Sequence, residues 1–289
     1  MNKDEVNQPV TVPSPAKINL FLRVGPKRPD GFHGLISWFC VVGLADELTF
    51  APHDGTDVSL SCNMPSVPCD ATNLILRAAS ALRPYASLSP GIHIHLHKRI
   101  PMGGGLGGGS SNAAATLSVL SRLWRCDVSD AKLREIGATL GSDVPFFLQP
   151  PSAICRGRGE LISPISAPSP RAVLLLLPDI VMPTPAVFRQ FDEMKLGTDL
   201  GAVEADLPSP QLSTEALLAS LANDLEAPAF AISPALGRLR SDVEACLGRP
   251  VRMSGSGSTL FTIYDNQVAA AAGAKQASGL TRALACTLS

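Results

Sequence analysis

The chain has 289 residues, a formal net charge of −1, and a composition that is 45% hydrophobic and 17% charged. It therefore has enough apolar material for one large domain or two smaller ones. Its lysines and arginines are scattered along the sequence rather than clustered, which argues against a nucleic-acid partner. The most apolar run, residues 172–177, is closed by Pro178 and falls far short of the roughly 20 residues of a membrane helix.

The polar first eleven residues contain no apolar stretch after a basic start, so we expect a flexible arm over residues 1–11 and no secretory signal. The seven cysteines are widely spaced and include no C-x-x-C pair. Neither a disulfide framework nor a zinc site is expected, and a reducing cytoplasm fits this cysteine usage.

Strand-like alternation begins after Ser14, and it places Lys17 and Asn19 on the same face because alternate strand residues point the same way. Proline, aspartate and glycine over residues 26–31 predict a turn. The sequence then predicts strands over 38–42 and 47–50, a helix over 73–82 and a strand over 91–99.

Two helices are predicted next, over residues 110–124 and 129–140, with Ser129 as N-cap of the second and Gly141 at its end. A segment rich in proline and serine, residues 162–171, marks a candidate domain boundary. Beyond it, strands are predicted at 172–177 and 258–264, helices at 214–221 and 235–246, and a long surface loop at 195–212. Strands interleaved with helices in this irregular way indicate an α+β fold.

The strongest motif is a run with six glycines among residues 103–109, followed by Ser110, Ser111 and a helix. Glycine allows positive φ angles and a close approach of the backbone to a ligand. The N-terminus of the following helix offers unpaired N–H groups and the positive end of its dipole. Together these features predict a phosphate-binding loop, and a serine hydroxyl there could also hold a magnesium ion.

Two better-known phosphate loops do not fit. In a P-loop the last glycine is followed by lysine, whereas Gly109 occupies that position here. Gly103, Gly105 and Gly108 match the dinucleotide pattern G-x-G-x-x-G, but no acidic residue ends a second strand about 20 residues further on.

A row of alternating histidines at positions 93, 95 and 97 has the spacing of a zinc-binding H-x-H pair on a strand. No carboxylate or cysteine lies close to it in sequence, and the intervening Ile94 and Leu96 give the alternation of a half-buried strand. We favour a solvated strand face.

With these motifs the chain resembles the GHMP kinase superfamily. The glycine run is similar to the phosphate loop of that superfamily, and several further segments match one member group whose substrate is a cytidine-diphospho alcohol. These segments are residues 15–22, 28–33, 73–79, 141–147, 157–160, 183–185, 223–226 and 253–258.

The resemblance implies a two-domain kinase, with an N-terminal ATP-binding domain over residues 12–163, a C-terminal domain over 164–289 and an active site in the cleft between them. It implies phosphorylation of the 2-hydroxyl of the cytidine-diphospho alcohol, with ATP and Mg²⁺ as cofactors, a small-molecule partner, and neither nucleic acid nor membrane. The residues expected to hold ATP are Pro101, Met102, Gly103, Gly104, Gly105, Leu106, Gly107, Gly108, Gly109, Ser110 and Ser111.

By the same resemblance, Asp143 is the base that accepts the hydroxyl proton, and Lys17 lies beside it and stabilises the transferring phosphoryl group. The substrate is expected to contact Asn19, Phe32, His33, Thr184 and Phe188, with the two phenylalanines stacked on the cytosine and His33 bonded to its edge. A homoserine- or mevalonate-type kinase and a non-catalytic nucleotide-binding relative remain the alternatives.

Overall fold

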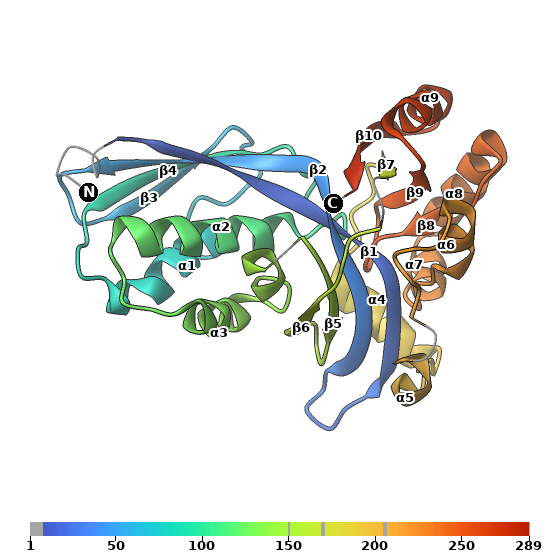
Figure 1. Cartoon of the computed structure of the whole chain (residues 1–289), viewed down its shortest axis with the longest axis horizontal. Helices are drawn as coiled ribbons and strands as arrows, with labels where there is room; N and C mark the ends of the chain where they lie inside the picture. Colours follow the sequence, from blue (N-terminus) through green and yellow to red (C-terminus); the bar gives the residue numbers. More distant parts are fainter. Residues whose placement is uncertain (1–7, 150, 169–170, 205–206, 289) are drawn as a thin grey trace. The chain divides into compact units, whose positions relative to one another are not determined.

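The computed structural model describes residues 8–149, 151–168, 171–204 and 207–288 (Figure 1). They form two compact units. The first contains Leu44–Ile100, Gly107–Pro150 and the chain up to Ala16, and the second contains Lys17–Gly43, Pro101–Leu106 and Pro151–Ser289. Helices and mainly antiparallel strands in both units confirm the α+β prediction. The chain passes between the units several times. The sequence predicts a single domain boundary, at residues 163–164, and this boundary stays a prediction.

The first unit is built on strand β4. Its neighbours are the C-terminal part of β2, antiparallel with Phe50 opposite Ile94, and β3, parallel with Leu60 opposite Ile94. The elements wholly within this unit are β3 (Val58–Cys62), α1 (Leu74–Leu82), η1 (Arg83–Tyr85), β4 (Gly91–His97), α2 (Gly108–Leu123), α3 (Asp130–Leu140) and η2 (Pro145–Leu148).

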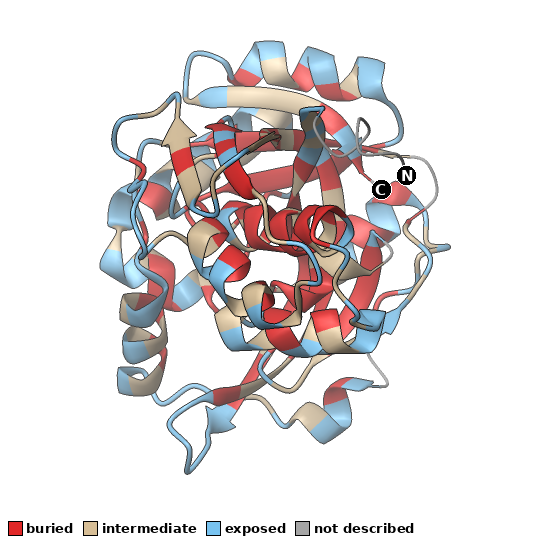
Figure 2. Cartoon of the chain, turned by 90° about the vertical axis from the view of Figure 1, so that its left-hand side faces the viewer, coloured by how far each residue is buried: buried red, intermediate tan, exposed pale blue. Residues whose placement is uncertain are grey.

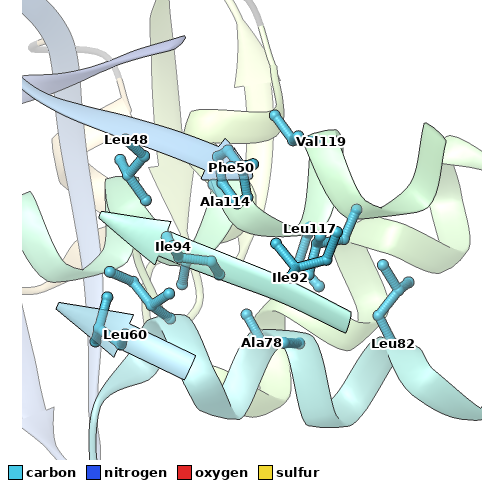
Figure 3. Packing of buried hydrophobic residues seen from close by; sticks show 14 of the residues in the cluster. Leu48, Phe50, Leu60, Ala78, Leu82, Ile92, Ile94, Ala114, Leu117 and Val119 are labelled. Atoms are coloured by element: carbon cyan, nitrogen blue, oxygen red, sulfur yellow. The ribbon is translucent and has the colours of Figure 1, made fainter. Parts of the chain in front are cut away.

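The core of the first unit lies between this sheet and helices α1 and α2, whose apolar faces meet it. Figure 3 shows Phe50 and Ile94 of the strands, with Ala78 of α1 and Leu117 of α2 among the residues that pack there. Each of these four side chains is fully buried. Burial of apolar side chains is the main force that stabilises the unit. Figure 2 shows helices that are buried along one side and exposed along the other.

Capping side chains explain where two of these helices begin. The Asn73 side chain accepts a hydrogen bond from the Ile75 N–H, and Ser129 accepts one from the Lys132 N–H at 3.2 Å. Such bonds satisfy backbone donors that a helix start leaves unpaired. The prediction of Ser129 as N-cap and of Gly141 as the end of α3 is confirmed.

The second unit is built on strand β7, which lies antiparallel between β9 and β10. Leu175 of β7 faces Phe261 of β9 on one side and Leu284 of β10 on the other. The next neighbour of β10 is the N-terminal part of β2, and β5 and β6 extend from there. The strands within this unit are β5 (Ser152–Arg156), β6 (Leu161–Pro164), β7 (Arg171–Leu177), β8 (Arg252–Met253), β9 (Leu260–Tyr264) and β10 (Arg282–Leu288).

Helices bury the apolar strand residues of this second unit. Leu174 and Leu176 of β7 pack in one cluster with Phe191, Leu236 and Ala270, which come from three different helices. The helices of the unit are α4 (Thr184–Glu193), α5 (Leu200–Val203), α6 (Thr214–Ser220), α7 (Glu226–Ile232), α8 (Pro234–Leu247) and α9 (Gln267–Ala277).

Three local predictions need correction or limits. Of the arm predicted over residues 1–11, residues 1–7 lie outside the described part, and strand β1 (Val10–Lys27) already begins at Val10 because Val10 and Val12 pack on the first core. The strands predicted at 38–42 and 47–50 are one strand, β2 (His33–His53). The loop predicted at 195–212 contains the short helix α5. Among the described residues, no helix has the length and apolar character of a membrane span.

Candidate active site

The glycine loop, residues 101–111, has the backbone geometry of an anion nest. Gly103, Gly105 and Gly107 have φ angles of +66°, +73° and +68°, and these positive values alternate with ordinary ones. Such alternation turns successive N–H groups towards one concave side, where they attract an anion. Gly107 is also the N-cap of α2, so the helix dipole adds to the attraction. The positive φ angles expected from the glycine-rich sequence therefore occur at three of these glycines.

A serine-containing turn holds the first half of the loop in place. This serine turn, residues 254–258, joins β8 to β9. The Ser254 hydroxyl donates to the Gly105 carbonyl oxygen at 3.0 Å, and the Thr259 N–H donates to the Gly104 carbonyl oxygen at 3.2 Å. A Cβ atom added to Gly105 would lie 2.2 Å from the Ser254 carbonyl oxygen, so only glycine fits this contact.

Lys17 and Asn19 are buried on β1 and face the same side, as the strand alternation predicts. The Lys17 ammonium donates to the Asn19 side-chain oxygen at 2.6 Å and lies over the Phe39 ring, 4.5 Å from its centroid. Lys17 is only 4% exposed, which is unlike a lysine on a strand surface. Its backbone N–H donates to the Leu106 carbonyl at 2.9 Å, so this strand also holds the glycine loop.

Asn19 connects the same strand to the serine turn. Its backbone N–H donates to the Ser254 hydroxyl at 3.2 Å, and its side-chain amide donates to the Ser37 hydroxyl at 2.9 Å. Ser254, which is fully buried, therefore accepts from Asn19 and donates to Gly105 through one oxygen. One hydroxyl fixes the glycine loop relative to the strand that carries Lys17.

Asp143 lies in the first unit, in the turn between α3 and η2. The turn is closed by a hydrogen bond from the Val144 N–H to the Gly141 carbonyl at 3.1 Å. Asp143 is half-buried, whereas its neighbour Val144 is fully buried and anchors the turn in the core. Lys17 belongs to the second unit, so the pairing of Lys17 with Asp143 stays a prediction.

The two serines at the end of the glycine loop differ in their surroundings. Ser111 is 1% exposed, and its hydroxyl accepts a hydrogen bond from the Ser14 hydroxyl at 2.8 Å. Ser110 is only half-buried at the first turn of α2. Because the Ser111 hydroxyl already serves a neighbouring side chain, Ser110 is the more accessible of the two for a ligand.

A buried ion pair that the sequence did not reveal lies behind the start of α2. The Asp46 carboxylate accepts from the Lys98 ammonium at 2.6 Å and from the backbone N–H groups of Arg99 and Ile100 at 2.7 and 2.8 Å. Burial lowers the pKa of Lys98, an effect that the bond to Asp46 partly offsets. A Cβ added to Gly108 would lie 3.0 Å from the Lys98 nitrogen. The pair therefore fixes the chain that enters the glycine loop and requires a small residue at the helix start.

The signal for this pair is weak in the sequence. In the sequence, Asp46 and Lys98 each stand beside another charged residue, so both look like solvated positions. Only their burial, at 1% and 7% exposure, distinguishes them.

The aromatic residues predicted to bind the base lie in the second unit. Phe32 is 52% exposed at the end of the hairpin between β1 and β2, and the Arg158 guanidinium lies 4.8 Å from its ring centroid. Phe188, on α4, packs on His33 with ring centroids 5.3 Å apart. The structure brings Phe188 and His33 together, and it leaves Phe32 accessible for stacking while Arg158 lies over the ring.

Thr184 and the segment 223–226 both contact the serine turn. The hydroxyls of Thr184 and Ser256 are 2.8 Å apart. The Asn223 side chain donates to the carbonyls of Met253 and Gly255, both at 2.8 Å, and so brackets Ser254 between two fixed peptide groups. This gives a physical role to Asn223, which the sequence motif alone did not supply.

The histidine row lies on β4, where His93 and His95 are exposed. Both of their rings bond to the Ser61 hydroxyl of β3 at 2.9 Å. Within the described residues no cluster of three metal-ligating side chains occurs.

Comparison with known proteins gives the same class as the loop and the fold. The model "GHMP kinases N terminal domain" matches residues 73–149, and "GHMP kinases C terminal" matches residues 207–279. A backbone nest at the start of a helix suits the binding of a phosphate group.

Relatives that match over nearly the whole chain identify one family within this class. The 4-diphosphocytidyl-2-C-methyl-D-erythritol kinase of Salinibacter ruber is 38% identical over 272 residues, which cover 91% of this chain and 93% of the relative. The enzyme of the same name from Prosthecochloris aestuarii is 37% identical and covers 96% of both chains. A crystal structure of 4-(cytidine 5'-diphospho)-2C-methyl-D-erythritol kinase superposes with a TM-score of 0.78 at 37% identity, over 96% of this chain and 99% of that one. The chain belongs to this family of GHMP kinases.

Proposed function

We propose that the chain transfers the γ-phosphoryl group of ATP to the 2-hydroxyl of 4-diphosphocytidyl-2-C-methyl-D-erythritol, a step in the non-mevalonate route to isoprenoid precursors. The observation that carries this proposal is the glycine loop, with its three alternating positive φ angles and its clamp by Ser254. The substrate follows from family membership, since relatives of that name match over nearly the whole chain.

The chemistry proposed for this chain relies on positioning and charge. Phosphoryl transfer needs alignment of the two oxygens and neutralisation of developing charge more than covalent participation. Asp143 would accept the proton of the attacking hydroxyl. The Lys17 ammonium, buried and held by Asn19 at 2.6 Å, would stabilise charge on the transferring phosphoryl group.

The loop suits the phosphates of ATP because its N–H groups form a nest at the positive end of α2. Mg²⁺, when bound, would neutralise charge between the phosphate oxygens. The half-buried Ser110 hydroxyl is the oxygen ligand best suited to assist it, because Ser111 already accepts from Ser14.

The cytidine end of the substrate is assigned to the aromatic residues of the second unit. Stacking on an aromatic face contributes about 1–3 kcal/mol per base. Phe188 and the exposed Phe32 would provide such faces, while Thr184 and Asn19 would contact the remainder of the substrate.

The decisive test replaces Asp143 with asparagine. We expect kcat to fall by about 10²–10⁴-fold, the range for loss of a general base, while circular dichroism and the unfolding midpoint stay close to wild type. Asp127→Asn, the same charge change at an exposed position, is the matched control and should retain activity. Turnover of Asp143→Asn near that of Asp127→Asn would remove Asp143 from the mechanism.

Two further measurements test the substrate. ATP consumption should require the cytidine-diphospho alcohol and should not be supported by homoserine or mevalonate. Phe188→Ala should raise KM for the cytidine substrate by roughly ten-fold or more, as loss of one stacking face predicts. An unchanged KM would exclude Phe188 from base binding.

A further inference from the structure

A single carboxylate connects helix α4 to the hairpin between β1 and β2. Asp192, in the last turn of α4, accepts a hydrogen bond from the Lys27 ammonium at 2.6 Å with one oxygen. Its other oxygen lies 3.1 Å from Nε2 of His33. Both Lys27 and His33 belong to the hairpin strands, so Asp192 holds the hairpin against the helix that carries Thr184 and Phe188.

The surroundings of His33 hold its ring in place. Nδ1 of His33 lies 3.0 Å from the Gly25 carbonyl oxygen, and Nε2 lies 3.1 Å from a carboxylate oxygen of Asp192. Each ring nitrogen therefore faces an oxygen of the protein. The His33 side chain is only 5% exposed, so solvent cannot readily replace either partner.

Two phenylalanines of helix α4 also pack on the His33 ring. Phe188 and Phe191 of α4 pack on the ring with centroids 5.3 and 5.5 Å away, and both are uncharged. Within the described part of the chain, Asp192 is the charged group that touches the ring, and Lys27 donates to the other oxygen of Asp192. Lys27 is 54% exposed, so solvent weakens its interaction with Asp192.

We propose that Asp192 is a positioning residue for recognition of the cytidine base. It holds the His33 ring against Phe188 and thereby fixes Phe188 relative to the hairpin that carries Phe32. This rests on the proposed function, and it revises one expectation from the sequence. The ring nitrogens of His33 are engaged within the protein, so they hold the aromatic residues in place rather than bond to the base edge.

The consequence is a separation between binding and chemistry. Asp192 has no contact with the glycine loop, Lys17 or Asn19 among the interactions described above. Its loss should therefore weaken binding of the cytidine substrate and leave phosphoryl transfer largely intact. A hydrogen bond to a charged group, when lost, weakens the dependent interaction by about ten- to a hundred-fold.

The experiment compares Asp192→Asn with Glu193→Gln in the full-length protein. Glu193 is the next residue of α4 and is exposed, so its replacement makes the same charge change on the same helix turn. We expect Asp192→Asn to raise KM for the cytidine substrate by about ten- to a hundred-fold, with kcat and KM for ATP within a factor of about two of wild type. Glu193→Gln should match wild type in all three values. Equal KM for the two variants, or a loss confined to kcat, would overturn the proposal.

A second measurement does not depend on activity. Nitrogen-15 NMR of the ring nitrogens in unliganded protein, with His33→Gln used to assign the signals, should show the His33 signals of Asp192→Asn shifted from their wild-type positions. The His33 signals of Glu193→Gln should stay at the wild-type positions. Unchanged His33 signals in Asp192→Asn would refute the proposed link to Asp192. Failure of the wild type to use the cytidine substrate would instead refute the proposed function. The NMR result would still test the contact between Asp192 and His33, because it is measured without substrate.

Discussion

Replacing Gly105 with alanine should disable the phosphate loop through one defined contact. Gly105 has a φ of +73°, and an added Cβ would lie 2.2 Å from the Ser254 carbonyl oxygen. Real Cβ contacts are not closer than about 3.0 Å, so the two segments must separate by at least about 0.8 Å. Ser254 cannot yield easily, because its N–H donates to the Thr259 carbonyl at 2.9 Å and Asn223 holds the carbonyls on either side. The glycine loop must therefore move.

The size of the effect follows from that displacement. Misplacement of a reacting group by about 1 Å can cost roughly 10²-fold in rate, so we expect kcat/KM for ATP to fall by about 100-fold. The left-handed backbone adds a conformational cost of about 1–2 kcal/mol for a residue with a side chain. Both effects are measurable, the first by steady-state kinetics with ATP as the varied substrate and the second by urea unfolding.

Gly248 provides the matched control because it shares the backbone geometry without the contact. It has a φ of +61°, at the end of α8, and an added Cβ would meet nothing within 4 Å. Gly248→Ala should lose about 1–2 kcal/mol of unfolding free energy and keep wild-type kinetics. If Gly105→Ala also kept wild-type kinetics, the clamp between Ser254 and the loop would have no role in ATP binding.

Three further outcomes are expected. Asn223→Ala should lower the unfolding free energy by about 1–3 kcal/mol in urea titrations, because the buried carbonyls of Met253 and Gly255 lose their donor. The same change should reduce kcat, because it loosens the serine turn that holds the glycine loop. An Asn223→Ala protein as stable and active as wild type would contradict this. Burial raises the pKa of Glu226 in spite of its contact with Arg240. The folded state thus keeps that proton to higher pH than the unfolded chain, and the unfolding free energy should fall as pH rises above the ordinary value of 4.5; in Glu226→Gln this part of the pH dependence should disappear, and an unchanged slope would refute it. Ser129→Ala should cost about 1 kcal/mol by loss of the α3 cap and leave the kinetics unchanged, whereas an unchanged unfolding midpoint would show that the cap contributes nothing.

Local chemistry explains which features the sequence could predict. Hydrophobic alternation predicted the strand that carries Lys17 and Asn19, and the structure places both side chains on one face, joined by a hydrogen bond. The Ser129 cap and the glycine-rich start of α2 were also predicted, because helix starts and positive φ angles depend on residues close together in the chain.

Predictions failed where packing decides between local alternatives. The break predicted between residues 42 and 47 does not exist, because strand β2 continues through it and pairs with β10 before the break and with β4 after it. Strand β1 begins at Val10, within the range 1–11 for which an arm was predicted, because Val10 and Val12 pack against a hydrophobic cluster. Neither partner can be read from the segment itself.

The sequence by itself determined the local character of residues 101–111, from which an anion-binding loop is predicted, since glycine density and a helix start are local properties of the chain. Only the tertiary structure decided how that loop is held. Ser254 is 149 positions from Gly105, yet its one hydroxyl joins the loop to the strand of Asn19. Asp46 likewise reaches Lys98 across 52 positions to fix the chain before the loop. Hydrogen bonds over such separations depend on the folded path of the chain, and no spacing rule encodes them.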